Sequence, residues 1–143
     1  MEEGSLAFVA VDWNGTVVPF FGMDLYPGAR ECLRRWRARG LMIFIVSRAP
    51  QAVIAADVAR AEVEADGVFG CTDKAPVLSD LHAQYGAGLL LGDTAADLRA
   101  AAEAGVAFAQ ARLDGEEPLP GARQSFCAWS EAESLLAVEG PTG

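Results

Sequence analysis

Three uninterrupted apolar runs of strand length constrain the fold of this chain more than any other feature of its sequence. They cover residues 6–11, 41–46 and 87–91. Continuous apolar runs are typical of strands that are buried on both faces, and segments with helical patterns separate these runs. Strands that alternate with helices predict a parallel sheet with helices on both faces. We therefore expect an α/β fold: a Rossmann-like three-layer sandwich around a central, mostly parallel sheet.

Breaker and capping residues place the remaining elements. Pro27 suits the first turn of a helix and Gly40 suits the residue after its end, so a helix is expected from Pro27 to Arg39. A capping-box sequence that begins at Ser130 indicates a last helix ending near Val138. Further helices are expected at 50–60, 75–85 and 95–104, and shorter strands at 67–70, 106–109 and 125–129.

The length and the net charge of the chain limit the number of its domains and the kinds of partner it can bind. At 143 residues the chain suits one domain, which would bury roughly 70% of its unfolded surface. We expect a single domain over residues 1–138 and a disordered tail over 139–143. The formal net charge of −9 argues against nucleic acid as a partner, because phosphate backbones are held by clustered lysine and arginine. The basic residues between Arg30 and Arg39 fit the solvated face of a helix better than a binding patch.

Cysteine usage and the first residues indicate the compartment. Cys32, Cys71 and Cys127 are far apart and form no CxxC pair, so neither a disulfide framework nor a zinc site is expected. The first residues are acidic where a signal peptide would be basic, and the apolar run behind them is too short to span a bilayer. We expect a cytoplasmic protein with reduced thiols and no membrane partner.

Polar side chains end the three apolar runs. Asp12, Ser47 and Asp93 each stand at the end of a different run, and Lys74 precedes a predicted helix. The carboxyl ends of parallel strands share one edge of the sheet, where open α/β sheets bind their ligands. We therefore expect these four side chains to converge there, with the hydroxyl of Thr16 in the neighbouring turn as a further donor.

Carboxylates gathered at one edge need a shared proton or a cation to relieve their repulsion. With Asp12, Asp93 and Asp97 near that edge, Mg²⁺ is the expected cation, because it takes oxygen ligands and keeps waters that a phosphate can replace. Lys74 and the Ser47 hydroxyl would supply positive charge and a donor to phosphate oxygens. An aspartate held against such a phosphate can attack it in line and form an aspartyl phosphate.

Each of these residues also has a purely structural explanation. Asp93 and Asp97 could be first-turn acids that the helix dipole favours. Ser47 could be a plain N-cap, and Lys74 could be an exposed lysine. Their order and their placement at consecutive strand ends favour a shared site over these separate explanations.

The same residues resemble the four motifs of the haloacid dehalogenase-like phosphatase superfamily. Residues 11–16 resemble the first motif, Asp-x-Asp-Gly-Thr, and residues 45–47 resemble the second, an apolar pair followed by Ser or Thr. Lys74 before a helix resembles the third motif. Residues 92–97, followed by 102–105, resemble the fourth motif, which is quite specific. The resemblance covers nearly the whole chain.

This resemblance implies a role for each residue that carries chemistry. Asp12 would be the nucleophile and, with the main-chain carbonyl of Asn14 and the carboxylate of Asp93, would hold Mg²⁺. Asp97 would be a further or water-mediated metal partner. Lys74 would steady the nucleophile and the transferring group.

Three further residues would contact the substrate. Ser47 would bind its phosphate, and Thr16 would offer a hydroxyl close by. Arg48 could reach the substrate, although an exposed surface arginine fits this position equally well.

One position departs from the family pattern. Phosphatases of this family carry a second aspartate as general acid and base where this chain has Asn14. An amide cannot protonate a leaving alkoxide or activate water, and that help is worth about 10²–10⁴ in rate, roughly 3–5 kcal/mol. Two interpretations follow: a weak or specialised phosphatase, or a catalytically impaired metal-binding interaction domain. We favour the phosphatase, because the other motif residues all remain.

The spacing between the motifs leaves no room for a cap domain. Between Asp12 and Ser47 there is space for a loop and one helix, and between Ser47 and Lys74 for one more helix. Without a cap to enclose an organic halide, dehalogenation is not expected. The substrate would be a phosphorylated small molecule or an exposed phosphate on a larger one. The apolar loop at residues 17–26 could contact substrate or form a homo-oligomer, or it could fold onto its own domain.

Overall fold

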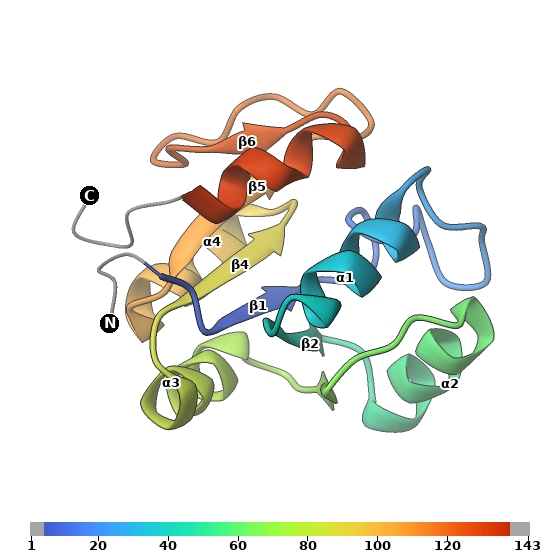
Figure 1. Ribbon diagram of the computed structural model, residues 1–143, viewed down its shortest axis with the longest axis horizontal. Helices are drawn as coiled ribbons and strands as arrows, with labels where there is room; N and C mark the ends of the chain where they lie inside the picture. The colour runs from blue at the N-terminus through green and yellow to red at the C-terminus, as the bar shows by residue number, and fades with distance from the viewer. Residues whose placement is uncertain (1–4, 138–143) are drawn as a thin grey trace.

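The computed structural model describes residues 5–137 and contains one six-stranded sheet (Figure 1). The strands lie in the order β3-β2-β1-β4-β5-β6, and every pairing between them is parallel. The strands are β1 (Phe8–Val11), β2 (Met42–Ser47), β3 (Gly67–Gly70), β4 (Gly88–Gly92), β5 (Ala107–Ala111) and β6 (Ser125–Phe126). The helices are α1 (Ala29–Ala38), α2 (Gln51–Ala61), α3 (Lys74–Tyr85), α4 (Ala95–Ala104) and the 3-10 helix η1 (Trp129–Ala137). The expected α/β fold is confirmed.

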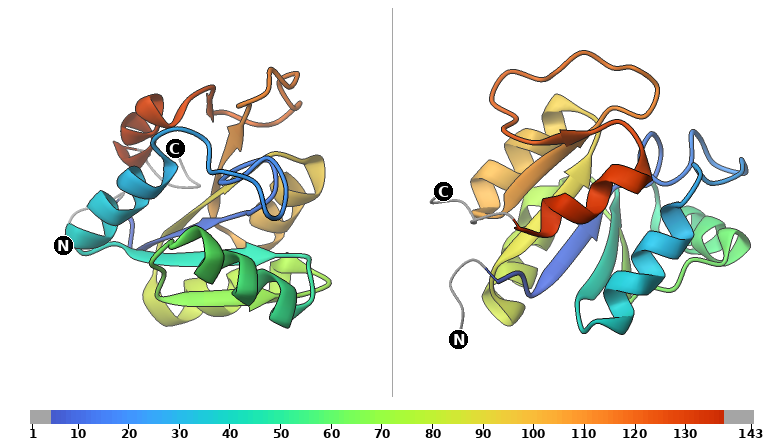
Figure 2. Two further views of the ribbon diagram at one scale, coloured as in Figure 1. Left: turned by 90° about the vertical axis from the view of Figure 1, so that its right-hand side faces the viewer. Right: turned by 45° about the horizontal axis from the view of Figure 1, so that its top comes forward.

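Alternate side chains of the strands enter two separate apolar cores, one on each face of the sheet. Val9 and Val11 of β1 belong to the core that α1, α2 and η1 cover. Phe8 and Ala10 belong to the core that α3 and α4 cover. In the right-hand view of Figure 2, α1 and η1 lie in front of the sheet and α4 lies behind it. Burial on both faces explains why the strands are apolar throughout.

The strand order reverses between β1 and β4. From β1 the chain runs outward through β2 and β3, and it then crosses to β4 and runs outward through β5 and β6. Val11 pairs with Leu91, so the residues that follow β1 and β4 emerge side by side. In open α/β sheets such a reversal is where ligands bind.

Most predicted elements occur within two residues of their expected bounds, and those of α4 are as expected. The first helix begins after Pro27, because Gly28, with a φ of 84°, occupies its N-cap position. Gly40 follows the last turn with a φ of 101°, as expected for the residue that ends a helix. The strand predicted at 125–129 is shorter, because the chain already enters η1 at Trp129.

The last helix differs in kind from the prediction. It is a 3-10 helix in which Ser130 lies inside the first turn and not at the cap. Its buried side chains are Trp129, Ala132 and Leu135, which recur every third residue. Three residues make one turn of a 3-10 helix, so this spacing keeps all three side chains against the sheet.

The connections around the site are short. A loop and α1 join β1 to β2, and α2 with β3 joins β2 to α3. The described chain therefore has no cap domain, as expected. None of the helices within residues 5–137 is long and apolar enough to cross a lipid bilayer. The expected tail at 139–143 and the expected helix end at Val138 lie outside the described residues.

Candidate functional site

Three carboxylates meet at the ends of β1 and β4. Asp12 directly follows β1, Asp93 directly follows β4, and Asp97 lies in the first turn of α4. One oxygen from each carboxylate lies within 4.8 Å of the other two. The fold thus brings together acidic side chains that two different strands and a helix supply.

The ammonium of Lys74 lies between two of these carboxylates. Its Nζ donates to Asp12 Oδ1 at 2.9 Å and to Asp97 Oδ1 at 2.6 Å. Lys74 is the first residue of α3 and is only 4% exposed. Since little water reaches these ion pairs, salt screens them weakly. Lys74 is therefore a fixed internal cation and not an exposed lysine.

Asp97 engages both of its carboxylate oxygens within the protein. Oδ1 accepts from Lys74, while Oδ2 accepts from the N–H and the hydroxyl of Thr94 at 3.3 and 3.1 Å. The Asp97 N–H in turn donates to Thr94 Oγ1, which completes a reciprocal capping box at the start of α4. With these bonds Asp97 orients the ammonium of Lys74. The role of Asp97 as a metal partner stays a prediction.

Gly15 leaves the space that the Asp93 carboxylate fills. A Cβ at position 15 would lie 2.1 Å from Asp93 Oδ2. The φ of 82° at Gly15 is also one that residues with a side chain rarely adopt. Glycine is therefore required here for two independent reasons, and Asp93 packs directly against the turn that follows Asn14.

Burial and crowding shift the pKa values of the site. Burial raises the pKa of Asp12 well above its usual range; the charge of Asp97 adds to this effect, and Lys74 opposes it. Burial also raises the pKa of Asp93. Burial alone would lower the pKa of Lys74, but Asp12 and Asp97 outweigh it and raise that pKa. One ammonium does not balance three carboxylates, so the site favours a further cation.

The donor set fits a hard divalent cation. The cluster consists of carboxylates, and oxygen ligands suit Mg²⁺, whereas zinc sites are built mainly from nitrogen and sulfur. The side-chain oxygen of Asn14 lies in the same pocket, buried and without a hydrogen-bond partner within residues 5–137. An unpaired buried acceptor costs free energy unless a donor or a cation meets it. The residues present therefore fit a magnesium ion.

The cluster opens into a pocket of about 400 Å³. Ser47, at the end of β2, is 5% exposed and lies in the pocket wall, where its hydroxyl accepts from the Ala49 N–H at 3.2 Å. Arg48 is exposed and lies in the same wall. All but one of the predicted site residues line this pocket: Asp12, Asn14, Ser47, Arg48, Lys74, Asp93 and Asp97.

Thr16 is the predicted site residue that does not line the pocket. Its side chain is 0% exposed, and its hydroxyl has no hydrogen-bond partner in the part of the chain that the structure describes. Its carbonyl accepts from the indole N–H of Trp129 at 2.9 Å. The geometry does not support a substrate contact through Thr16, because the turn directs this side chain into the protein interior.

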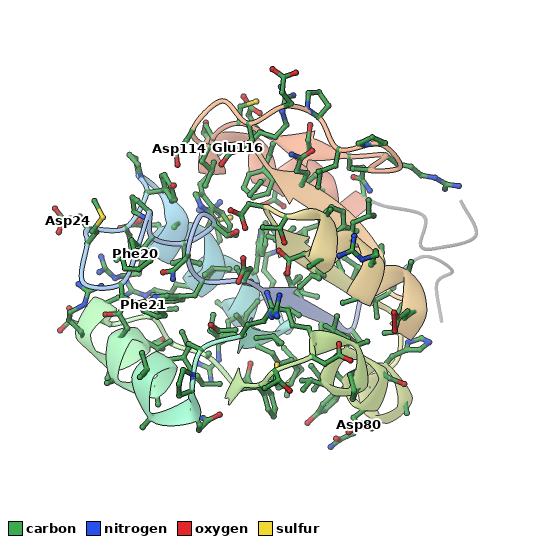
Figure 3. The ribbon with its side chains drawn as sticks, turned by 180° about the vertical axis from the view of Figure 1, so that it is seen from behind. Phe20, Phe21, Asp24, Asp80, Asp114 and Glu116 are labelled. Atoms are coloured by element: carbon green, nitrogen blue, oxygen red, sulfur yellow. The ribbon has the colours of Figure 1, made fainter. Side chains whose placement is uncertain are left out.

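The apolar loop at residues 17–26 folds partly onto its own domain. Val17 is fully buried, and the Tyr26 hydroxyl donates to Asp114 Oδ2 at 2.5 Å. Phe20, near the tip of the loop, is 60% exposed and lies at the side of the molecule in Figure 3. The loop is therefore anchored at both ends and presents an apolar tip near the pocket.

Sequence reasoning missed one buried carboxylate close to the site. Asp57 lies within α2, is 8% exposed, and accepts from the indole N–H of Trp13 at 2.7 Å. A signal was present, because Asp57 falls between Ile54 and Val58 on the inward face of an alanine-rich helix. A charged residue at such a position is seldom left without polar partners.

Solved structures with the same fold include several haloacid dehalogenase-superfamily phosphatases. A D,D-heptose 1.7-bisphosphate phosphatase from B. bronchiseptica, solved with magnesium and phosphate, is 19% identical, with a TM-score of 0.72 over 92% of this chain and 98% of that chain. A HAD-superfamily hydrolase from Ehrlichia chaffeensis is 14% identical, with a TM-score of 0.73 over 95% of this chain and 97% of that chain.

A third similar structure is the 3-deoxy-D-manno-octulosonate 8-phosphate phosphatase from Moraxella catarrhalis, in complex with magnesium, phosphate and the KDO molecule. It is 16% identical, with a TM-score of 0.69 over 92% of this chain and 85% of that chain. No protein-family model and no curated protein matches the sequence. At these identities the likeness shows the fold: the chain has the haloacid dehalogenase-like architecture along nearly its whole length.

Proposed function

We propose that this chain, which has the fold of haloacid dehalogenase-like phosphatases, hydrolyses a phosphate monoester through an aspartyl phosphate on Asp12 and depends on Mg²⁺. One observation carries the proposal: the Asp12 carboxylate stands at the end of β1, paired to the buried Lys74 and beside Asp93. Two of the structural neighbours were solved with magnesium and phosphate, which supports the same chemistry.

In the first step a carboxylate oxygen of Asp12 attacks the phosphorus in line with the leaving oxygen. A new P–O bond forms on Asp12, the bond to the leaving oxygen breaks, and that oxygen takes the electron pair. Lys74 and the Ser47 hydroxyl donate to the phosphoryl oxygens and balance their charge. Water then attacks the phosphorus, the P–O bond to Asp12 breaks and its electron pair returns to the carboxylate, and inorganic phosphate is released. The proton that this water loses passes through solvent to the leaving oxygen, because Asn14 cannot carry it.

The metal would be held by the chain's own oxygens. Asp12, the main-chain carbonyl of Asn14 and Asp93 would be its ligands, with Asp97 as a further or water-mediated partner. When bound, Mg²⁺ neutralises charge on the phosphoryl oxygens. Lys74 favours the ionised form of Asp12 and fixes the orientation of its carboxylate, because its Nζ contacts Asp12 Oδ1 directly.

Asn14 narrows the esters that this site would hydrolyse well. An alkyl leaving group needs a proton as it departs, and an amide cannot give one, so alkyl phosphates should lose the full 10²–10⁴ in rate, about 3–5 kcal/mol. Aryl and acyl leaving groups are stable as anions and should lose less. The expected activity is therefore weak on alkyl phosphates and better on phosphates with good leaving groups.

The rest of the substrate would extend towards a second pocket of about 250 Å³. The two pockets share Arg48, Lys74 and Asp97 in their walls, so Arg48 would lie beside the part of the substrate next to the phosphate. An uncapped opening suits a phosphorylated small molecule or an exposed phosphate on a larger one.

We propose that the protein works in the cytoplasm, away from nucleic acid and membranes, and that the loop at 17–26 supports a homo-oligomer.

Turnover of p-nitrophenyl phosphate with Mg²⁺, compared between the native chain and Asp12→Asn, tests the mechanism. We expect activity to fall by about 10³-fold or more, because the variant lacks the nucleophile. Asp80→Asn is the matched control, since it removes an exposed carboxylate on α3 that does not line the pocket and should leave turnover unchanged. Equal turnover in native protein and Asp12→Asn would refute the phosphoenzyme.

The second candidate is a metal-binding interaction domain without turnover, which the amide at position 14 favours. It predicts that Mg²⁺ binds, as heat in a calorimetric titration shows, while no phosphate ester is hydrolysed. It also predicts that a partner protein is recovered with the purified chain. Binding of Mg²⁺ together with hydrolysis of an aryl or acyl phosphate would exclude it.

A further inference from the structure

The Asp57 carboxylate within α2 is the meeting point of three segments around the site. Oδ2 accepts from the Trp13 indole N–H at 2.7 Å, and Oδ1 accepts from the Gly22 backbone N–H at 3.1 Å. Arg60, one turn further along α2, donates through Nε to Oδ1 at 2.6 Å and through Nη2 to Oδ2 at 3.1 Å. Its Nη2 also donates to the Met23 carbonyl at 3.0 Å. We call this set of bonds the Asp57 clamp.

The first segment held by the clamp is the turn that follows the candidate nucleophile. Trp13 stands between Asp12 and Asn14, and its side chain is fully buried. Its carbonyl accepts from the N–H groups of Thr16 and Val17 at 3.1 and 2.9 Å, which closes the turn. Fixing the indole therefore fixes the backbone from which both neighbouring residues project.

The second segment is the wall of the pocket formed by the loop at 17–26. Gly22 and Met23, near its tip, are tied to α2 by backbone hydrogen bonds to the clamp. Phe21, the residue before them, lines the pocket. Figure 3 shows Phe20 and Phe21 on this loop next to α2. The loop is therefore held as a fixed wall.

The burial and the charge of Asp57 strengthen the hydrogen bonds of the clamp. Asp57 is 8% exposed and accepts four hydrogen bonds, so every strong acceptor site on its carboxylate has a donor nearby. Bonds from donors to an ionised carboxylate are about twice as strong as neutral ones. The hydrogen bonds from Arg60 lower the pKa of Asp57, which keeps the carboxylate charged at neutral pH.

We propose that Asp57 is a positioning residue, which holds the Asp12–Asn14 turn and the 17–26 wall in one fixed arrangement for phosphoryl transfer. The inference rests on the proposed phosphatase activity. Asp57 touches no reacting atom and acts through Trp13 and Gly22. A nucleophile displaced by about 1 Å can cost on the order of 10² in rate, so loosening the turn should slow the chemical step. Phosphate binding by Ser47 and Lys74 should change little.

The test compares Asp57→Asn with the native chain on p-nitrophenyl phosphate and Mg²⁺. We expect kcat to fall about 10–100-fold and KM to change by less than about threefold. Trp13→Phe keeps the aromatic ring and removes the indole donor, so it should lower kcat in the same direction. The double variant should be little worse than Asp57→Asn alone, because both changes break the same contact.

The matched control is Asp66→Asn. The Asp66 carboxylate also accepts from an arginine, Arg37, and from a backbone N–H, that of Ile43, but it lies at the opposite end of β2 from the pocket. The variant Asp66→Asn should lower thermal stability, as Asp57→Asn does, and should leave kcat unchanged. A purely structural role for Asp57 would instead give both variants the same small change in kcat, and that result overturns the proposal.

Amide hydrogen exchange separates this inference from the phosphatase proposal. In Asp57→Asn, peptides covering residues 13–26 should exchange faster than in the native chain, while β4 and α3 stay protected. If the native chain shows no turnover, the phosphatase proposal fails and the exchange result alone decides the clamp. Unchanged exchange over residues 13–26 overturns the clamp, whatever the activity.

Discussion

Lys74→Met is the substitution that tests the candidate site most directly through stability. Methionine keeps a long, unbranched side chain and removes the charge. In the native protein the ammonium contacts Asp12 at 2.9 Å and Asp97 at 2.6 Å while it is only 4% exposed. The variant leaves both carboxylates buried without their internal cation.

The expected cost follows from that geometry. Removing one partner from a buried ion pair costs about 3–5 kcal/mol, because the remaining charge sits where little water can solvate it. Here two carboxylates lose one shared partner, and protonation of Asp12, whose pKa burial already raises, absorbs part of the cost. We expect the free energy of unfolding to fall by about 3–5 kcal/mol, with a drop in Tm of roughly 10–15 °C.

Urea unfolding followed by tryptophan fluorescence measures this change, first with a chelator and then with Mg²⁺. Magnesium at 100 times its Kd should stabilise the native chain by about 2.7 kcal/mol. The same concentration of Mg²⁺ should stabilise Lys74→Met by more, because the variant lacks the internal cation and should bind the ion more tightly. Arg34→Met, which removes an exposed cation, should stay within about 0.5 kcal/mol of the native chain. A loss below 1 kcal/mol for Lys74→Met with the chelator would show that the carboxylates need no internal cation, and the reasoning would be wrong.

Four further outcomes are expected. Asn14→Asp should raise turnover most on alkyl phosphates, by up to about 10²–10⁴, and a steady-state comparison of alkyl and aryl phosphates measures it. Arg48→Ala should raise KM several-fold with kcat unchanged, because Arg48 lines both pockets without touching the nucleophile. Gly15→Ala should abolish Mg²⁺ binding in a calorimetric titration, because its Cβ would meet the Asp93 carboxylate at 2.1 Å. Arg60 lowers the pKa of Asp57, so the stability from this carboxylate is present above its unfolded pKa near 4 and is lost as pH falls through the lower folded value. Asp57→Asn should therefore lose less stability than the native chain between neutral and acid pH, as urea unfolding at several pH values would show.

The sheet and most of the pocket could be predicted because they depend on local patterns. An apolar run of strand length followed by a polar residue marks a buried strand and its carboxyl end, and parallel pairing then brings those ends together. This logic is enough to place Asp12, Ser47 and Asp93 in one pocket. The placement of Lys74 in the same site was predicted from its position before a helix.

The features that could not be predicted depend on contacts between segments far apart in the chain. The direction of the Thr16 side chain follows from the hydrogen bonds of its turn, which composition does not reveal. The clamp joins Trp13 to Asp57, 44 positions away, and a single charged residue in a helix gives no hint of its partner. The 3-10 form of η1 reflects the buried spacing of Trp129, Ala132 and Leu135, which also fits part of an α-helical pattern.

The hydrogen bond from Trp129 to the Thr16 carbonyl has a consequence for how the protein is made. It spans 113 positions of sequence and reaches the turn beside the candidate nucleophile. Closing so long a loop is entropically costly, and the contact is available only after residue 129 has left the ribosome. A nascent chain can therefore assemble β1 to β4 and the Asp57 clamp while its Asp12 turn still lacks the bond from Trp129, and the site should mature among the last parts of the molecule. Pulse-labelled translation intermediates that stop before residue 125 should accordingly fail to retain Mg²⁺.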